Sequence, residues 1–169
     1  MNVVVVFVGA MGSGKSTIGA RVATALGAPF LDNDALLEQH TGHTAADLAA
    51  TDGIDALHRA EAEVLLAALR APGPAVIAAA ASTITAAEVR DALRVATVVW
   101  LRAAPDVLAG RLPESPTRPF AGADPARLVR TQSEQRDNLF AEAADIVVET
   151  DKSDINAVVA RVLDLLRES

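Results

Sequence analysis

Residues 9–17 of this chain read Gly-Ala-Met-Gly-Ser-Gly-Lys-Ser-Thr, the most informative segment of the sequence. It fits the pattern G-x-x-x-x-G-K-[ST], in which successive backbone N–H groups and a helix N-terminus surround a phosphate group. The preceding residues, 3–8, are valine and phenylalanine, as in a strand that is buried on both faces. After the pattern, Ile18, Val22 and Leu26 recur at helical spacing. The sequence therefore predicts a strand, a phosphate-binding loop and a helix in succession.

The loop residues have separate expected roles in nucleotide binding. Its glycines permit the backbone path and the close approach of a phosphate. Lys15 is placed to reach the β- and γ-phosphates of ATP, and the Ser16 hydroxyl to ligate Mg²⁺. A glycine-rich turn with an incidental lysine is the alternative, but the flanking strand and helix favour nucleotide binding. The expected nucleotide-binding residues are Gly12, Ser13, Gly14, Lys15, Ser16 and Thr17.

Length and composition restrict the class of protein. The 169 residues fit one domain, which we expect to span residues 1–169. The net charge of −7 argues against a general affinity for nucleic acid or for anionic membranes. The chain has no cysteine for disulfides or thiolate metal sites, and no apolar stretch long enough to span a membrane. The apolar run at the N-terminus lacks a basic region ahead of it, so we expect a core strand and not a signal peptide. We expect a cytoplasmic monomer.

Apolar runs alternate with helical patterns along the chain. This alternation predicts an α/β fold in which a parallel sheet has helices on both faces. The predicted strands are residues 3–8, 28–31, 75–79, 96–101 and 145–149.

Several helices can be placed from capping and periodicity. Predicted helices cover residues 34–40 and 55–69, and residues 85–88, Thr-Ala-Ala-Glu, have the arrangement of a capping box. Pro105 stands where a further helix would begin. A final helix should begin near Ser153 or Asp154, with Ile155, Val158, Val159, Val162 and Leu165 or Leu166 facing inward.

Residues 112–123 interrupt the alternation with three prolines and Arg118 between two helical stretches. An ordinary surface loop is one interpretation. We favour a lid that closes over the phosphates and carries Arg118 inward, because the chain already has a phosphate-binding loop.

Asp32 and Asp34 stand at the end of the second apolar run. Carboxylates two residues apart on a strand share a face, so both could point into a cleft at the carboxyl edge of the sheet. Asp34 could instead cap the following helix. The nearby phosphate-binding loop favours a catalytic or metal-binding role.

Among the basic residues, Arg111, Arg118 and Arg136 differ from the rest by location. The first two flank or lie within the proline-rich segment, and Arg136 lies on the helix after it. An arginine fork suits both phosphate and carboxylate. The histidines do not have the spacing of a zinc site.

Taken together, these motifs resemble a shikimate kinase in order and spacing through nearly the whole chain. The resemblance implies a small P-loop NTPase-like domain of three layers, with a five-stranded parallel sheet and a mobile lid. It also implies transfer of the ATP γ-phosphate to the 3-hydroxyl of shikimate. The matching residues are the loop at 9–17, Ile18-Gly19, Asp32, Asp34, Arg111, Arg118-Pro119 and Arg136-x-x-Leu139-Phe140.

The resemblance assigns roles on the nucleotide side. It implies that Lys15 and Arg118 neutralise the moving phosphoryl group, that Ser16 and Asp32 hold Mg²⁺, and that Arg111 lies along the adenine.

On the acceptor side, it implies that Asp34 orients or deprotonates the hydroxyl and that Arg136 binds the carboxylate. The family also carries a Phe-Arg-x-x-Glu signature, whose arginine is a second clamp on that carboxylate. Here residues 57–61 read Leu-His-Arg-Ala-Glu, which places His58 at the arginine position. Arg59 is not an obvious substitute, because one residue along a helix turns a side chain by about 100°.

A second departure follows the third predicted strand. The family has three consecutive glycines there, whereas this chain has Ala80-Ala81-Ser82. Alanine keeps the N–H, but its methyl group obstructs both close approach and positive φ. We therefore expect His58, Ala80 and Ala81 to line an acceptor pocket that differs from that of the family.

The leading hypothesis is an Mg-ATP-dependent kinase of a small hydroxylated molecule, with shikimate as the first named acceptor. A different hydroxy acid, cyclitol or sugar is the alternative that His58 and the alanines suggest. A nucleotide-binding regulatory protein without transfer activity and a nucleoside monophosphate kinase are further alternatives. Residues 35–60 contain less arginine than the substrate-binding region of nucleoside monophosphate kinases usually does.

Overall fold

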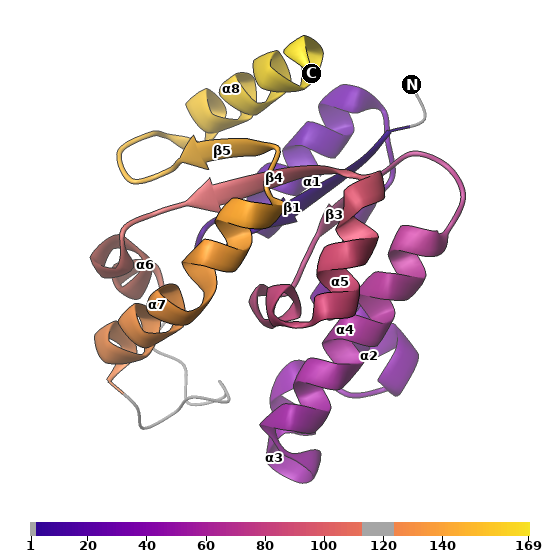
Figure 1. The fold of residues 1–169 in the computed structure, drawn as a ribbon, viewed down its shortest axis with the longest axis vertical. Helices are drawn as coiled ribbons and strands as arrows, with labels where there is room; N and C mark the ends of the chain where they lie inside the picture. Colours follow the sequence, from indigo (N-terminus) through magenta and orange to yellow (C-terminus); the bar gives the residue numbers. More distant parts are fainter. Residues whose placement is uncertain (1–2, 113–123) are drawn as a thin grey trace.

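Parallel strands form the centre of the structure, a computed structural model that describes residues 3–112 and 124–169. Within these residues the sheet has five strands in the order β2-β3-β1-β4-β5 (Figure 1). Every neighbouring pair is parallel. The strands are β1 (Val4–Val8), β2 (Phe30–Asp32), β3 (Ala75–Ala78), β4 (Thr97–Arg102) and β5 (Ile146–Glu149). The predicted α/β sheet is therefore confirmed.

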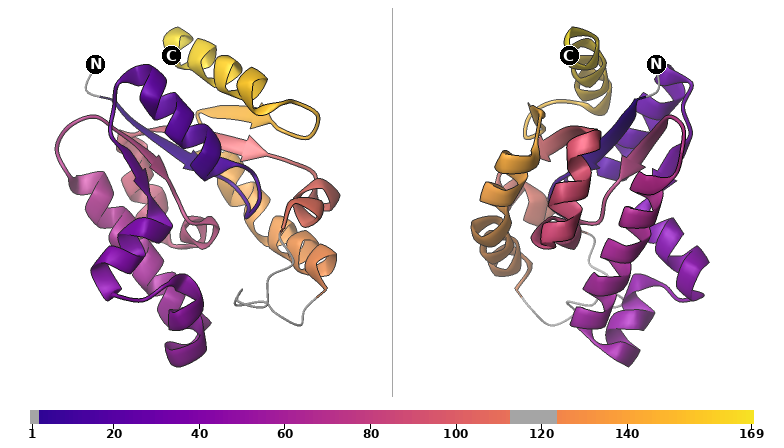
Figure 2. Two further views of the ribbon diagram at one scale, coloured as in Figure 1. Left: turned by 180° about the vertical axis from the view of Figure 1, so that it is seen from behind. Right: turned by 45° about the vertical axis from the view of Figure 1, so that its right-hand side comes forward.

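Helices cover both faces of the sheet and make three layers. On one face lie α1 (Lys15–Leu26) and α8 (Ile155–Glu168), which are seen in front of the sheet in the left view of Figure 2. On the other face, α4 (Ile54–Arg70), α5 (Ala87–Ala92) and α7 (Pro125–Ala143) pack against the strands. The remaining elements are α2 (Asn33–Thr41), α3 (Ala45–Asp52), α6 (Pro105–Arg111) and the short 3₁₀ helices η1 (Ala81–Thr85) and η2 (Leu93–Val95).

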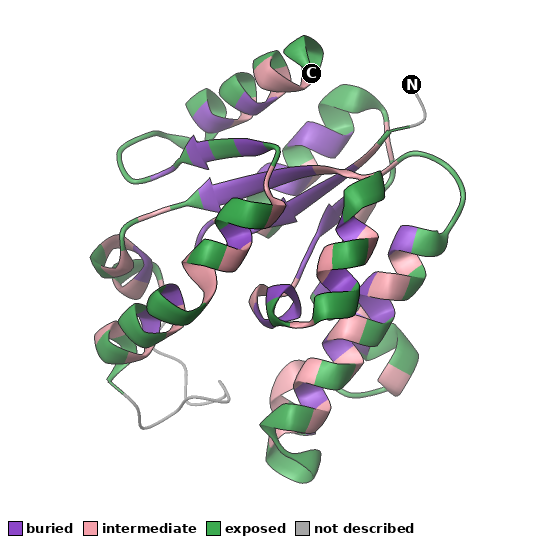
Figure 3. Ribbon diagram, viewed as in Figure 1, coloured by how far each residue is buried: buried purple, intermediate pink, exposed green. Residues whose placement is uncertain are grey.

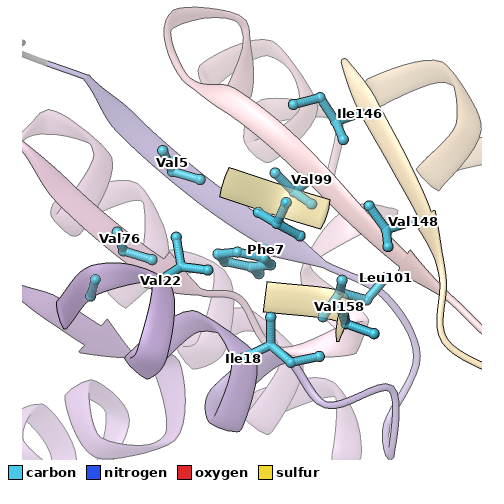
Figure 4. Packing of buried hydrophobic residues seen from close by; sticks show 12 residues of the cluster. Val5, Phe7, Ile18, Val22, Val76, Val99, Leu101, Ile146, Val148 and Val158 are labelled. Atoms are coloured by element: carbon cyan, nitrogen blue, oxygen red, sulfur yellow. The ribbon is translucent and has the colours of Figure 1, made fainter. Parts of the chain in front are cut away.

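Side chains of the central strand, β1, point alternately to the two faces of the sheet and contribute to the hydrophobic core on each face. Val5 and Phe7 point toward α1 and α8, where they contact Ile18 and Val158 (Figure 4). Val6 and Val8 point to the opposite face, and all of these strand residues are buried. Figure 3 shows the central strands as continuously buried. Burial on both faces explains why β1 is apolar at every position and does not alternate.

The ends of several elements agree with the sequence. Pro105 is the first residue of α6, and the Asp154 side chain caps α8 by accepting from the N–H of Ala157 at 2.9 Å. In the described part of the chain, no helix is long and apolar enough to cross a membrane. Residues 113–123, which hold Arg118 and nearly all of the expected lid, lie outside the described residues.

Two local predictions were wrong, and one helix was missed. The capping box at residues 85–88 does not form: the Thr85 hydroxyl donates to the Ser82 carbonyl at 2.7 Å, and Ala86 precedes α5 without a side-chain cap. Ile155 is 43% exposed and does not face the core, because it is the first residue of α8. The helix α3 was not predicted, although Thr44 and Asp47 form a capping box at its start.

The strand order places a crevice at the carboxyl ends of β1 and β3. These strands are neighbours, but α1 follows β1 onto one face while η1 and α5 follow β3 onto the other. Ligands of open α/β sheets bind where successive connections diverge in this way. The fold therefore predicts a ligand site at this edge of the sheet.

Candidate active site

A cavity of about 700 Å³ opens at this edge of the sheet. It is lined by the phosphate-binding loop, the start of α2, one face of α4, the junction of β3 with η1, and α7. All five residues that the sequence assigned to the acceptor line it, namely Asp34, His58, Ala80, Ala81 and Arg136. Gly12, Gly14, Lys15, Ser16 and Thr17 line the same cavity. The structure thus brings the predicted nucleotide and acceptor residues together.

The backbone of the loop requires glycine at defined positions. Gly12 and Gly14 have φ of +83° and +94°, in the region that other residues rarely adopt. At Gly9, whose φ is +145°, an added Cβ would lie 2.6 Å from the carbonyl oxygen of Leu101. The glycines of the pattern therefore shape a loop that passes close to β4 and turns into α1.

Lys15 lies across the loop that precedes it. Its Nζ donates to the carbonyl oxygens of Gly9 at 2.9 Å and Ala10 at 2.8 Å. Burial lowers the pKa of Lys15 to about 8, although the negative charges of Asp34 and Asp32 oppose this shift. Phosphate oxygens beside this amine would raise its pKa further and stabilise the charged form.

Ser16, Asp32 and Asp34 form a short connected group. The Ser16 hydroxyl donates to Oδ2 of Asp32, and Oδ1 of Asp32 accepts from the N–H of Asp34 at 2.9 Å. Asp32, and not Asp34, is therefore the residue that caps α2. This result excludes the alternative in which Asp34 is the cap, and the Asp34 side chain lines the cavity.

Arg136 and His58 approach the cavity from α7 and α4. The Nε atom of Arg136 is buried without a hydrogen-bond partner among the described residues, which is unusual for a guanidinium N–H. Burial lowers the pKa of Arg136, and the charge of Glu61 opposes this shift. Half-burial lowers the pKa of His58, and the positive charge of Arg136 lowers it further. His58 is therefore largely neutral at pH 7, while Arg136 is a cation that lacks a partner at Nε.

The alanines after β3 do not strain the backbone. Ala80 has φ −65° and ψ 142°, and Ala81 begins η1. No residue other than glycine has positive φ in the described ranges. The prediction that alanine conflicts with a positive φ here was therefore wrong. The two alanines do line the cavity, where their methyl groups occupy space that glycine would leave open. Arg59 is exposed and does not line the cavity, as its position on the helix predicted.

Two predicted nucleotide-side residues, Ser13 and Arg111, do not line the cavity. Ser13 is buried inside the loop and does not line the cavity. Arg111 donates to the hydroxyl of Thr150 at 3.2 Å and to its carbonyl oxygen at 2.6 Å. Its Cβ is near Gly12, so Arg111 lies beside the loop but outside the cavity lining. Arg118 lies outside the described residues.

The sequence reasoning assigned no role to Glu61 and Ser82, which also line the cavity. Both are buried, and the Ser82 hydroxyl donates to Oε2 of Glu61. Burial raises the pKa of Glu61, although the hydrogen bond from Ser82 opposes this shift. Glu61 follows His58 by three residues, so the two share one face of α4. That spacing, and the final Glu of the Phe-Arg-x-x-Glu signature, which Glu61 matches, were the available signals for Glu61.

Comparison with known proteins identifies the family. The family model described as shikimate kinase matches residues 11–167. The shikimate kinase of Symbiobacterium thermophilum is 38% identical over 168 residues, which cover 97% of this chain and 96% of that protein. The shikimate kinase of Mycobacterium avium is 40% identical over 162 residues, which cover 95% of this chain and 92% of that protein.

Solved structures agree with this assignment. A shikimate kinase from Acinetobacter baumannii in complex with shikimate has a TM-score of 0.91 and 28% identity, and the match covers 98% of this chain and 93% of that one. A gluconokinase from Sinorhizobium meliloti, with a TM-score of 0.60 and 23% identity over 98% of this chain and 96% of its own, shares the fold alone. The sequence motifs, the cavity and these matches lead to one conclusion: the chain belongs to the shikimate kinase family.

Proposed function

We propose that this protein transfers the γ-phosphate of ATP to the 3-hydroxyl of shikimate. The observation that carries the proposal is the convergence of Lys15, Asp34 and Arg136 on one cavity beside the phosphate-binding loop. These groups are a phosphate-binding cation, a carboxylate and a second cation suited to a carboxylate. Membership of the shikimate kinase family supports the same reaction.

The loop and its neighbours fit Mg²⁺ with ATP. Magnesium prefers oxygen ligands and is usually held by one or two protein groups together with phosphates and water. The Ser16 hydroxyl and the Asp32 carboxylate are such groups and already contact each other. No cluster of three or more acidic or histidine side chains suited to a metal occurs in residues 3–112 and 124–169. When bound, the ion would neutralise phosphate charge, and Ser16 with Asp32 would hold it.

Asp34 and Arg136 serve the acceptor in this proposal. The acceptor oxygen forms a bond to the γ-phosphorus as the bond from that phosphorus to the ADP oxygen breaks. The hydroxyl proton passes to the Asp34 carboxylate, and Arg136 binds the acceptor carboxylate. Arg118 would add positive charge at the moving phosphoryl group, and Arg111 would contact the adenine.

A panel of acceptors tests this function directly. With MgATP present, we expect shikimate to give ADP and shikimate 3-phosphate with a higher kcat/KM than other hydroxy acids, cyclitols or sugars. Asp34→Asn should lower kcat by about 10²-fold or more, because it removes the proton acceptor. The half-buried His58 in place of the family arginine favours a second candidate, a kinase of another hydroxylated acceptor. If such an acceptor gives a higher kcat/KM than shikimate, that acceptor and not shikimate is the substrate.

Nucleotide affinity should depend on pH through Lys15. Its pKa of about 8 in the unliganded protein means that the ammonium form is lost as the pH rises above that value. Phosphates bind the charged form, so the dissociation constant for MgATP should rise about tenfold between pH 7 and pH 9. Calorimetric titration across this range measures the effect. Lys15→Ala should bind weakly and show little of this dependence; an equal slope in that variant would contradict the assignment.

A further inference from the structure

Ser82 is the hydroxyl-bearing residue that ends a run of four alanines, residues 78–81, at the cavity. The backbone turn around it is held by other groups. The N–H and hydroxyl of Thr83 donate to the carbonyl oxygen of Ala80 at 3.1 and 2.6 Å, and the Thr85 hydroxyl donates to the Ser82 carbonyl. The Ser82 side chain does not take part in these bonds and donates to Glu61 instead. Its hydroxyl therefore serves the carboxylate and not the turn.

Glu61 is a buried carboxylate close to a buried cation. It is 7% exposed, and its charge influences Arg136 on α7 and Lys15 on α1. Nevertheless, no ion pair within 4.0 Å joins Glu61 to Arg136 in the described residues. Two opposite charges in a poorly solvated site attract strongly, so a restraint on one of them is needed to keep them apart. The hydrogen bond from Ser82 is such a restraint.

The unpartnered Nε of Arg136 shows what this separation preserves. A direct pair with Glu61 would satisfy this N–H and cancel the charge that an anionic acceptor needs. Held by Ser82, Glu61 instead stabilises the charged guanidinium from a distance, and the Arg136 Nε–H has no hydrogen-bond partner among the described residues. Asn33 adds a second restraint on the same turn of α4, because its Nδ2 donates to the Glu61 carbonyl oxygen at 3.3 Å.

We propose that Ser82 is a positioning residue that holds Glu61 away from Arg136 and so keeps the Arg136 guanidinium open for the carboxylate of the acceptor. The proposal rests on the proposed function for the identity of that acceptor. The competition between Ser82 and Arg136 for the Glu61 carboxylate does not depend on which acid is the acceptor.

Steady-state kinetics give the first test. Ser82→Ala should raise KM for shikimate about tenfold or more, the size expected when a hydrogen bond to a charged group is lost, and change kcat less than twofold. Ser82→Thr keeps the hydroxyl and should restore a KM near that of the parent. Thr85→Ala removes a hydroxyl from the same turn that bonds the Ser82 backbone, and KM should stay unchanged. A fall in kcat alone, or no change in KM for Ser82→Ala, would overturn the proposal.

The second test needs no acceptor. The ¹H–¹⁵N signal of the Arg136 Nε–H should become slowly exchanging and shift in Ser82→Ala, because the guanidinium then pairs with Glu61. In the double variant Ser82→Ala with Glu61→Gln, the signal should return to its parent position, because the neutral amide attracts the guanidinium less. An unchanged signal in Ser82→Ala rejects the competition. If the signal behaves as expected while the parent enzyme does not phosphorylate shikimate, the proposed function fails and the positioning role stands.

Discussion

Replacing Lys15 with alanine is expected to lower kcat by about 10³-fold or more while the protein stays folded. Phosphoryl transfer depends mainly on positioning and on neutralising charge, and removal of one fixed charge donor in such a site typically costs this much. Lys15 has no evident replacement on the loop, because the chain has only two lysines and the other, Lys152, lies in the turn after β5.

The variant should not lose stability at neutral pH. In the folded protein the pKa of Lys15 is about 8, below its ordinary value of 10.5. A lowered lysine pKa means that the charged form opposes folding below pH 8, and that this cost disappears as the pH rises from about 8 to 10.5. Removing the charge at pH 7 therefore offsets the loss of the bonds to Gly9 and Ala10. We expect a Tm equal to or above that of the parent.

Initial-rate assays of ADP release together with thermal unfolding check both expectations. Lys152→Ala is the matched control, because it removes an exposed lysine from the same chain. The control should keep full activity. Turnover within tenfold of the parent in a folded Lys15→Ala protein would show that the ammonium is not the main charge on the transferred group.

The fold could be predicted because its signals are local. The valine run of β1, the glycine pattern and the periodicity of α1 each lie within one short segment. By contrast, α3 was missed because it buries only one large side chain, Leu48, and so has no helical repeat of large apolar residues. The capping box at Thr85 failed because a nearer carbonyl oxygen, that of Ser82, accepts its hydroxyl in a 3₁₀ turn.

The site residues that belong to a sequence motif were predicted. Those that depend on contacts between residues far apart in the sequence were missed. The sequence placed Asp32 and Asp34 correctly at the edge of the sheet, but only the structure shows which of them caps α2. Glu61 and Ser82 are 21 residues apart and meet through the packing of α4 on η1. No local pattern encodes that contact, because it depends on the tertiary arrangement of the two elements.

His58→Arg is expected to raise kcat/KM for shikimate by about 30-fold or more. A bidentate charged clamp on a desolvated carboxylate is worth about 2–5 kcal/mol, and the parent imidazole cannot supply it at neutral pH. Burial and the charge of Arg136 lower the pKa of His58, so the imidazolium forms only in acid. In the parent, KM for shikimate should therefore fall as the pH decreases below the ordinary histidine value of 6.5. In His58→Arg this dependence should be lost.

Adding Ala80→Gly and Ala81→Gly should give a smaller further gain than His58→Arg itself. Ala80 has an ordinary extended backbone, so glycine relieves no strain there and acts only by removing a methyl group from the cavity. His43→Arg is the control, since it adds the same charge at an exposed position outside the cavity lining. An equal gain in that control would indicate a general effect of charge. If His58→Arg and the triple variant both leave kcat/KM for shikimate unchanged, residues 58, 80 and 81 do not form the acceptor pocket.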